Sequence, residues 1–297
     1  MSTQIPKTLA IILSDFGRDA ALRFCALLSD LERRQICEYL PEGATFYDEY
    51  RRLSLVLIGD LGFAKAPVLD TYDGLLDDRV LVGFPSGLTP HDVAARLGVL
   101  ALQAMVGAVH RGVEQIFVLV PCNTLAPVQW QLQQSFSSEA GLRAMLAETS
   151  MSAEPYGDVL SRLAQLSTIF PTVPEAVVER AVKEGIATIL PLGTVEIDEV
   201  YRQAVARQGQ EMTLLRPDQA GRDAVLHAIQ AGISKSGAAR KLARANLTKL
   251  VLGFQEIHGD LLCVEACTDL DYGVGLDSNT VYAQAVVEAV YGPSCST

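Results

Sequence analysis

At positions 116–124 the chain reads Ile116-Phe-Val-Leu-Val-Pro-Cys122-Asn123-Thr124, an apolar run that ends directly in a small polar loop. The same pattern returns in Asp260-Leu-Leu-Cys-Val-Glu-Ala-Cys267-Thr268, which places Cys267 145 positions after Cys122. Short apolar runs bounded by turn residues are typical of strands buried on both faces of a parallel sheet. Because ligands of such sheets bind beyond the carboxyl ends of the strands, we expect each half of the chain to bring one cysteine to a binding cleft.

Similar runs alternate with longer helical stretches along most of the chain. The expected strands are 9–13, 53–58, 80–84, 116–120, 187–190 and 261–264, and the expected helices are 18–31, 91–110 and 198–208. This alternation predicts an α/β fold of mostly parallel sheets flanked by helices. Residues 128–166 show no clear period, so we expect that segment to be irregular, with a turn at Glu154-Pro155-Tyr156-Gly157.

Length and composition bound the class of protein. The 297 residues exceed what one hydrophobic core usually supports, and the 49% hydrophobic content can fill two cores, so we expect two domains. The 35 acidic against 24 basic residues give a formal net charge of −11, which argues against a nucleic-acid partner. No apolar run approaches the roughly 18 residues of a membrane span, and the start lacks an export signal. We therefore expect no membrane partner and a cytoplasmic location.

Two thiols facing each other across a small molecule suit one kind of reaction. A thiolate can remove a proton from one face of a carbon while the opposite thiol returns a proton to the other face, which inverts the stereocentre. Microscopic reversibility then gives both residues both roles. The thiol pKa falls where backbone amides or helix amino termini stabilise the thiolate, and loops between strands and helices supply such groups.

Other chemistries find little support in the sequence. The four histidines show no metal-ligand spacing, no serine lies in a GxSxG elbow, and no glycine loop fits a nucleotide fingerprint. We therefore expect no metal site and no cofactor. Cys25 and Cys263 lie in apolar contexts and are interpreted as small buried residues, whereas Cys37 and Cys295 are interpreted as peripheral.

Four segments carry a resemblance to a known family. Val120-Pro121-Cys122-Asn123-Thr124 resembles the Cys-Asn-Thr motif of the aspartate/glutamate racemase superfamily. Ala266-Cys267-Thr268-Asp269-Leu270 is similar to its second motif, Cys-Thr-Glu, with Asp269 in place of the usual glutamate. The stretch from Leu192-Gly193-Thr194 to Tyr201 and the tail from Leu276-Asp277-Ser278 to Val290 also resemble family segments in the expected order.

The resemblance implies a fold and an activity. It implies two pseudo-symmetric α/β domains with the active site between them, 1–125 plus 269–297 with the first cysteine and 126–268 with the second. It also implies cofactor-independent racemisation of an acidic amino acid, aspartate or glutamate, and the homodimers common in the family. Cys122 and Cys267 would be the two acid/base residues. The residues implied to bind or line the substrate are Asn123, Thr124, Thr194 and Thr268, together with Ser14 and Asp15 from the first loop.

The chain also departs from the family pattern. Its first loop, Ser14-Asp15-Phe16-Gly17-Arg18, lacks the glycine-rich form of aspartate racemases. It is closer to the Asp-Ser-Gly form of glutamate racemases, with serine and aspartate reversed. The cysteine separation is longer than expected, and the excess is placed in residues 128–166. Arg51, Arg52 and Arg202 are candidates for holding the side-chain carboxylate, but none lies in a motif that assigns it.

Two kinds of alternative stay open at this point. The same fold supports maleate cis–trans isomerisation, hydantoin racemisation and arylmalonate decarboxylation in relatives of the family. A binding protein that has kept the cleft and lost turnover is a further alternative. Two retained cysteines favour proton transfer on two faces, because binding alone has no need for both.

Overall fold

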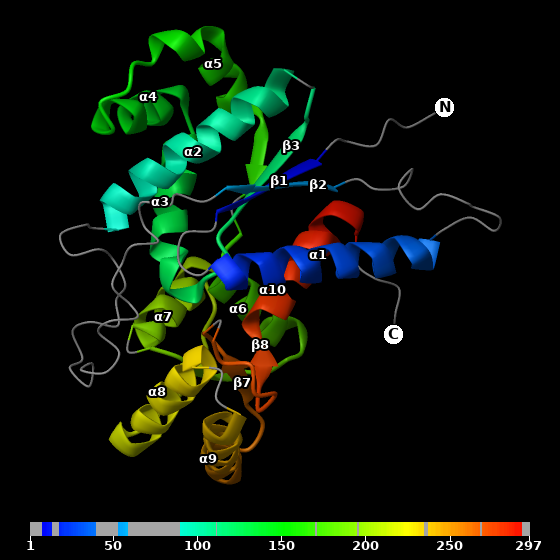
Figure 1. Cartoon of the computed structure of the whole chain (residues 1–297), viewed down its shortest axis with the longest axis vertical. Coiled ribbons are helices and arrows are strands. Elements are labelled where there is room, and N and C mark those ends of the chain that lie inside the picture. The colour runs from blue at the N-terminus through cyan, green and yellow to red at the C-terminus, as the bar shows by residue number, and fades with distance from the viewer. Residues whose placement is uncertain are drawn as a thin grey trace.

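The structure is a computed structural model that describes residues 8–13, 18–39, 53–58, 90–110, 112–169, 171–194, 196–234, 237–267 and 269–292. The strand expected at 80–84 lies outside these residues. The fold is α/β, as predicted, with two parallel sheets and helices on their faces (Figure 1).

The first sheet has four parallel strands in the order β2-β1-β3-β4. Its strands are β1 (Thr8–Leu13), β2 (Leu53–Ile58), β3 (Gln115–Leu119) and β4 (Ser167–Ile169). Strand β1 occupies the middle of the sheet, with Ile12 opposite Leu119 of β3. Burial on both faces explains why the sequence of β1 is apolar without alternation.

The second sheet repeats this arrangement with the order β6-β5-β7-β8, again all parallel. Its strands are β5 (Thr188–Leu192), β6 (Thr213–Leu214), β7 (Leu262–Glu265) and β8 (Leu276–Asp277). Leu192 pairs with Glu265, so β5 and β7 end at the same level of the sheet.

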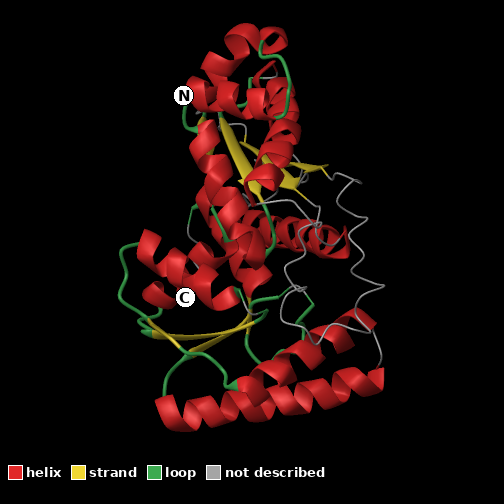
Figure 2. Ribbon diagram, turned by 90° about the vertical axis from the view of Figure 1, so that its left-hand side faces the viewer, coloured by secondary structure: helices red, strands yellow, loops and turns green. Residues whose placement is uncertain are grey.

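Helices form three layers around and between the sheets (Figures 1 and 2). The outer layer on the first sheet holds α2 (Pro90–His110), α3 (Ala126–Phe136), α4 (Glu139–Glu148) and α5 (Gly157–Gln165). The central layer holds α1 (Arg18–Tyr39), α6 (Val173–Lys183), α7 (Ile197–Arg207) and α10 (Ser278–Tyr291). The outer layer on the second sheet holds α8 (Gln219–Ser234) and α9 (Gly237–His258).

The hydrophobic cores follow these layers because strand side chains alternate between the two faces of a sheet. Ile12 of the first sheet and Val264 of the second belong to one continuous core with the central helices. Ile11 faces the other way, into the core under α2, α4 and α5. The two sheets therefore share a buried central layer.

Residues 128–166 are helical, so the prediction of an irregular segment was wrong. Leu142, Met145 and Leu146 of α4 and Leu160 and Leu163 of α5 recur at helical spacing and are buried under α2. Short helices separated by turn residues conceal this period in the sequence. The segment also differs from the predicted division at 125/126, since α3 to α5 and β4 belong to the first sheet.

Helix α2 is the one described helix long and apolar enough to cross a membrane, over His91–His110. Its most apolar window is 61% buried inside the protein. Leu97, Leu102 and Met105 are at most 1% exposed and pack against the first sheet and the helices covering it. Helix α2, which the sequence predicted over 91–110, is therefore a core helix.

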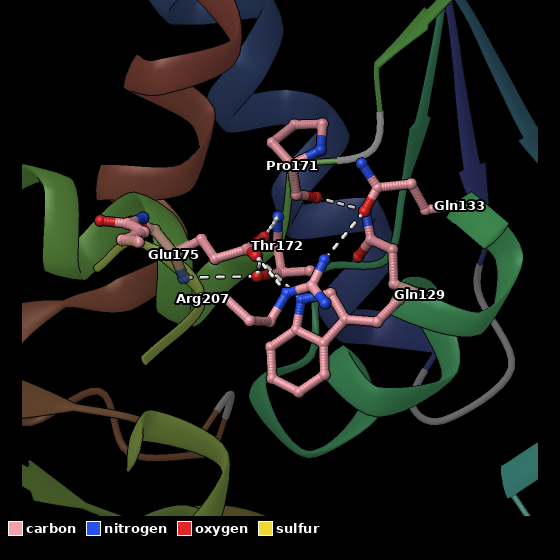
Figure 3. A network of polar contacts seen from close by, with 8 residues as sticks. Gln129, Gln133, Pro171, Thr172, Glu175 and Arg207 are labelled. Atoms are coloured by element: carbon pink, nitrogen blue, oxygen red, sulfur yellow. Dashed lines mark hydrogen bonds and ion pairs between the residues drawn. The ribbon is translucent and has the colours of Figure 1, made fainter. Parts of the chain in front are cut away.

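A polar network joins the first sheet's helices to the central layer (Figure 3). The Glu175 carboxylate of α6 accepts hydrogen bonds from Trp130 Nε1 of α3 at 3.0 Å and from Arg207 Nε of α7 at 3.0 Å. It also accepts from the Thr172 backbone at 3.2 Å in a capping box. Arg207 lies over the Trp130 ring, 4.9 Å from its centroid. One carboxylate thus ties three helices together just after the chain crosses between the sheets.

Replacing Glu175 with alanine is expected to lower the free energy of unfolding by about 2 kcal/mol, because the N-cap, the indole and the guanidinium all lose an acceptor. Urea unfolding followed by circular dichroism measures this change. Glu179→Ala is the matched control on the same helix, since its ion pair with Lys183 is exposed and contributes at most about 0.5 kcal/mol. Equal destabilisation by the two variants would contradict the assigned role of Glu175.

Candidate active site

The first cysteine follows β3 at the carboxyl end of the first sheet. Cys122 is extended, with φ −148° and ψ 122°, and a short 3-10 turn, η2 (Asn123–Leu125), leads from it into α3. Pro127 in the first turn of α3 favours this start, because its fixed φ suits a helix and its missing N–H is not needed there. The strand, turn and helix thus place the thiol beside the backbone N–H groups of Thr124 and Leu125 at the start of the helix.

The Cys122 sulfur has polar neighbours from its own loop. Sγ lies 3.2 Å from Thr124 Oγ1. Burial raises the pKa of Cys122 above its usual value, and hydrogen bonds from the Thr124 side chain and from the Leu125 and Thr124 backbones oppose this effect. The thiol is therefore the resting form, in surroundings that offer several donors to a thiolate.

The second cysteine follows β7 in the corresponding place of the second sheet. Cys267 comes two residues after Glu265, and its carbonyl accepts a hydrogen bond from the Leu270 backbone at 3.0 Å. Burial raises the pKa of Cys267 to about 12. The backbone N–H groups of Asp269 and Leu270 lower it, whereas the charges of Asp269 and of Cys122 raise it.

The two sulfurs belong to one electrostatic environment. A charge on Cys122 raises the pKa of Cys267, and the Asp269 carboxylate raises the pKa of both thiols. Both cysteines are partly exposed, so neither is sealed in a core. Each cysteine follows the strand after which the sequence placed it, and Asp269, whose position in the second motif was the only signal of a role, raises the pKa of both thiols.

Asn123 lies between the two cysteine loops. Its side chain is 2% exposed; Oδ1 accepts a hydrogen bond from Tyr201 Oη at 3.1 Å, and Nδ2 donates to Ser278 Oγ at 3.0 Å. Ser278 Oγ in turn donates to the Glu265 carbonyl at 2.9 Å. Both ends of the Asn123 amide therefore contact protein, and a contact of this side chain with substrate stays a prediction.

Thr194 borders the Cys267 loop through close backbone packing. The Ala266 N–H donates to the Leu192 carbonyl at 2.8 Å, and a Cβ on Gly193 would lie 3.3 Å from the Ala266 carbonyl oxygen. The Thr194 hydroxyl is buried and has no hydrogen-bond partner among the described residues. An unpaired buried hydroxyl is a donor available to a ligand. The Oε2 atom of Glu196, two residues later, is also buried without a hydrogen-bond partner among the described residues. Nothing in the sequence around Glu196 indicated this.

Glu265 organises the loop that carries Cys267. This residue is 1% exposed, and its carboxylate accepts backbone hydrogen bonds from Tyr272 at 3.3 Å and from Val274 at 2.9 Å. Burial raises the pKa of Glu265, and these backbone donors lower it. Sequence reasoning missed this role, although a charged residue inside an apolar strand was a usable signal.

Several predicted site residues cannot be placed in the structure. Ser14, Asp15, Thr268, Arg51 and Arg52 lie outside the described residues.

Arg202 projects from α7 with 65% of its side chain exposed and pairs with Glu199. Within the described residues, no three His, Cys, Asp or Glu side chains are grouped to hold a metal ion.

Comparison with solved structures identifies the architecture. The chain aligns over 96% of its length with a candidate Asp/Glu racemase from Yersinia pestis, covering 99% of that chain with a TM-score of 0.56 and 15% identity. It has the fold of the aspartate/glutamate racemases. An aspartate racemase from Picrophilus torridus aligns over the same share of this chain and 94% of its own, with a TM-score of 0.53 and 15% identity. No protein-family model and no curated protein sequence matches the chain.

The two cysteines occupy equivalent places in the two sheets. In each sheet the third strand, β3 or β7, is followed by a cysteine loop, and the link from Asn123 through Ser278 to Glu265 joins the two loops directly. At 15% identity, the similarity to these proteins establishes a shared fold and nothing about the reaction. The chemistry has to be argued from the residues themselves.

Proposed function

We propose that this chain is a member of the aspartate/glutamate racemase family and racemises aspartate or glutamate without a cofactor. One observation carries the proposal: Cys122 and Cys267 follow β3 and β7, which occupy equivalent places in two four-stranded parallel sheets. Two thiols in one site are what proton removal on one face and return on the other face require.

In the proposed reaction one cysteine enters as thiolate and the other as thiol. The thiolate takes the α-hydrogen of the amino acid as a proton, forming its S–H bond while the C–H electron pair moves toward the substrate carboxylate. The opposite S–H bond then breaks and gives its proton to the other face of the α-carbon. The charge on sulfur has moved from one cysteine to the other, so the reverse reaction starts from the opposite thiolate.

Groups around the sulfurs support this chemistry. Each sulfur has backbone N–H donors from its own loop, which stabilise the thiolate when it forms. The buried, unpaired hydroxyl of Thr194 is available to the substrate carboxylate, whose charge grows as the proton leaves. A thiolate whose pKa is raised by burial is also a stronger base, which suits a weakly acidic C–H bond.

The test is incubation of the protein with each enantiomer of aspartate and of glutamate in deuterated water. For one of the two amino acids, we expect the optical rotation to decay to zero whichever enantiomer is supplied. The inverted product should carry deuterium on its α-carbon. Absence of exchange with all four compounds would remove the proposal. Formation of fumarate from maleate in a parallel sample would replace racemisation with the isomerase alternative.

We also propose a partner, a cellular location and an oligomeric state for this enzyme. A small amino acid is the partner that it requires, and a cytoplasmic location keeps both thiols reduced. A homodimer is proposed from the resemblance to the family alone.

A further inference from the structure

A chain of three hydrogen bonds connects the two cysteine loops through the protein interior. Tyr201 Oη donates to Asn123 Oδ1 at 3.1 Å, Asn123 Nδ2 donates to Ser278 Oγ at 3.0 Å, and Ser278 Oγ donates to the Glu265 carbonyl at 2.9 Å. Asn123 follows Cys122 directly, and Glu265 precedes Cys267 by two residues. The chain of bonds is therefore a short path between the backbones that carry the two sulfurs.

We propose that Tyr201, Asn123 and Ser278 are positioning residues that hold the two cysteine loops in register, and that Asn123 serves catalysis through this link. The proposal rests on the proposed function for its catalytic consequence. The link itself is a property of the structure and has a test that does not depend on turnover.

Burial makes the link specific. The exposed fractions of Tyr201, Asn123, Ser278 and Glu265 are 0%, 2%, 1% and 1%. A buried polar group that loses its partner still bears the full cost of its desolvation. Breaking any one of the three hydrogen bonds is therefore unfavourable. Burial also raises the pKa of Tyr201, which keeps its hydroxyl protonated and able to donate.

The direction of each bond fixes the residue type at each place. The Ser278 hydroxyl has one hydrogen and gives it to the Glu265 carbonyl, so it must accept from Asn123. The Asn123 oxygen is then left to accept from Tyr201. An aspartate at position 123 has the same shape and accepts from Tyr201, but it has no hydrogen to give to Ser278.

The two ends of the link are anchored independently. Ser278 is the first residue of α10, whose start is fixed by the Asp277 side chain accepting from the Asn279 and Thr280 backbones at 3.2 and 3.1 Å. Tyr201 lies in the middle of α7, in the central core. Because both helices belong to the layer shared by the sheets, the link sets the first cysteine loop against the second.

Loss of the link has a characteristic kinetic consequence. A misplacement of about 1 Å at a reacting group can lower the rate about 100-fold. If one sulfur is displaced from its place opposite the α-carbon, the other sulfur still removes the α-hydrogen as a proton, exchanges it as S–H for deuterium from the solvent, and returns the deuterium to the same face. The substrate then gains deuterium without inversion, a result that general loss of active protein does not produce.

The experiment compares Tyr201→Phe with Tyr282→Phe. The control removes a hydroxyl from an equally buried tyrosine that donates to the Pro171 carbonyl at 2.7 Å, also contacts Gln129 and the Val120 backbone, and is not part of the chain of bonds from Tyr201 to Glu265. With aspartate and glutamate in deuterated water, we expect Tyr201→Phe to lower kcat for racemisation about tenfold, to change KM less than about threefold, and to raise the ratio of exchange to inversion about tenfold. Tyr282→Phe should leave that ratio unchanged.

Two further variants keep the test decisive if Tyr201→Phe folds poorly. Ser278→Ala should reproduce the change in ratio. Asn123→Asp should exceed it, because a buried carboxylate then faces the Ser278 oxygen. If instead Asn123→Asp raises KM while Tyr201→Phe and Ser278→Ala behave as wild type, Asn123 binds substrate and the proposal is overturned.

A measurement without turnover separates this proposal from the proposed function. Alkylation by iodoacetamide, followed by mass spectrometry, reports how accessible Cys122 and Cys267 are in each variant. We expect Tyr201→Phe to speed alkylation of both cysteines at least about fivefold relative to Tyr282→Phe. Unchanged alkylation would overturn the link even in an active racemase, and the expected increase would support it even if neither amino acid is turned over.

Discussion

Replacing either Cys122 or Cys267 with serine is expected to lower the racemisation rate at least about 1,000-fold. A positioned general acid or base contributes about 10²–10⁴-fold, and a serine hydroxyl keeps the size of the thiol without becoming an anion near neutral pH. Polarimetry from both enantiomers of the active substrate measures the loss. Each single variant should lose inversion in both directions, since the two sulfurs exchange roles between them.

The double variant sharpens this prediction. Residues that act as a unit are not additive, so Cys122→Ser with Cys267→Ser should be no slower than the slower single variant. Cys37→Ser is the matched control, because this cysteine is exposed on α1. If either single variant kept more than about a tenth of the wild-type rate, the two-base mechanism would be wrong.

The value of kcat/KM is expected to rise about 100-fold between pH 6.5 and pH 8.5. Burial raises the pKa of Cys267 to about 12 and also raises that of Cys122, so both thiols are protonated at neutral pH in the free protein. Below the pKa, the fraction of thiolate grows about tenfold with each pH unit, and the reaction needs one thiolate. Initial rates at low substrate concentration follow this fraction.

The shape of the plot of kcat/KM against pH shows whether both cysteines are neutral thiols in the free protein. A plateau reached below about pH 8 would show a thiolate already present at rest and would contradict the assignment of two neutral thiols. Circular dichroism at each pH is the control for folding. Raised thiol pKa values favour the neutral form in the folded state, so the folded state loses stability only above the ordinary thiol pKa, near pH 9.

The strands were predictable because their signal is local. The runs at 9–13 and 116–120 are apolar on both faces, and the structure places β1 and β3 at the centre of the first sheet. Residues 128–166 were misjudged because their helices are short and their buried positions become a pattern only once α2 is there to receive them. Packing against a distant helix is not encoded in a window of ten residues.

For the candidate site, sequence named the two cysteines but not what holds them. Position after an apolar strand predicted Cys122 and Cys267 as site residues, since parallel strands present their carboxyl ends to a ligand, and their catalytic role stays a prediction. The partners of Asn123 lie 78 and 155 residues away at Tyr201 and Ser278, and neither bond has a local signature. In the sequence, Glu265 is a charged residue in an apolar strand with no visible reason. The structure supplies the reason, because its carboxylate accepts a hydrogen bond from the backbone of the following loop.

The order of residues along the chain thus determined the α/β class, the central strands and the pair of thiols, because each depends on near neighbours in sequence. Tertiary structure alone decided that the sheets share a helical layer and that Asn123 joins the two loops. These features depend on burial and on distances between remote segments. Those quantities exist only once the chain has folded and excluded water from the space between the sheets.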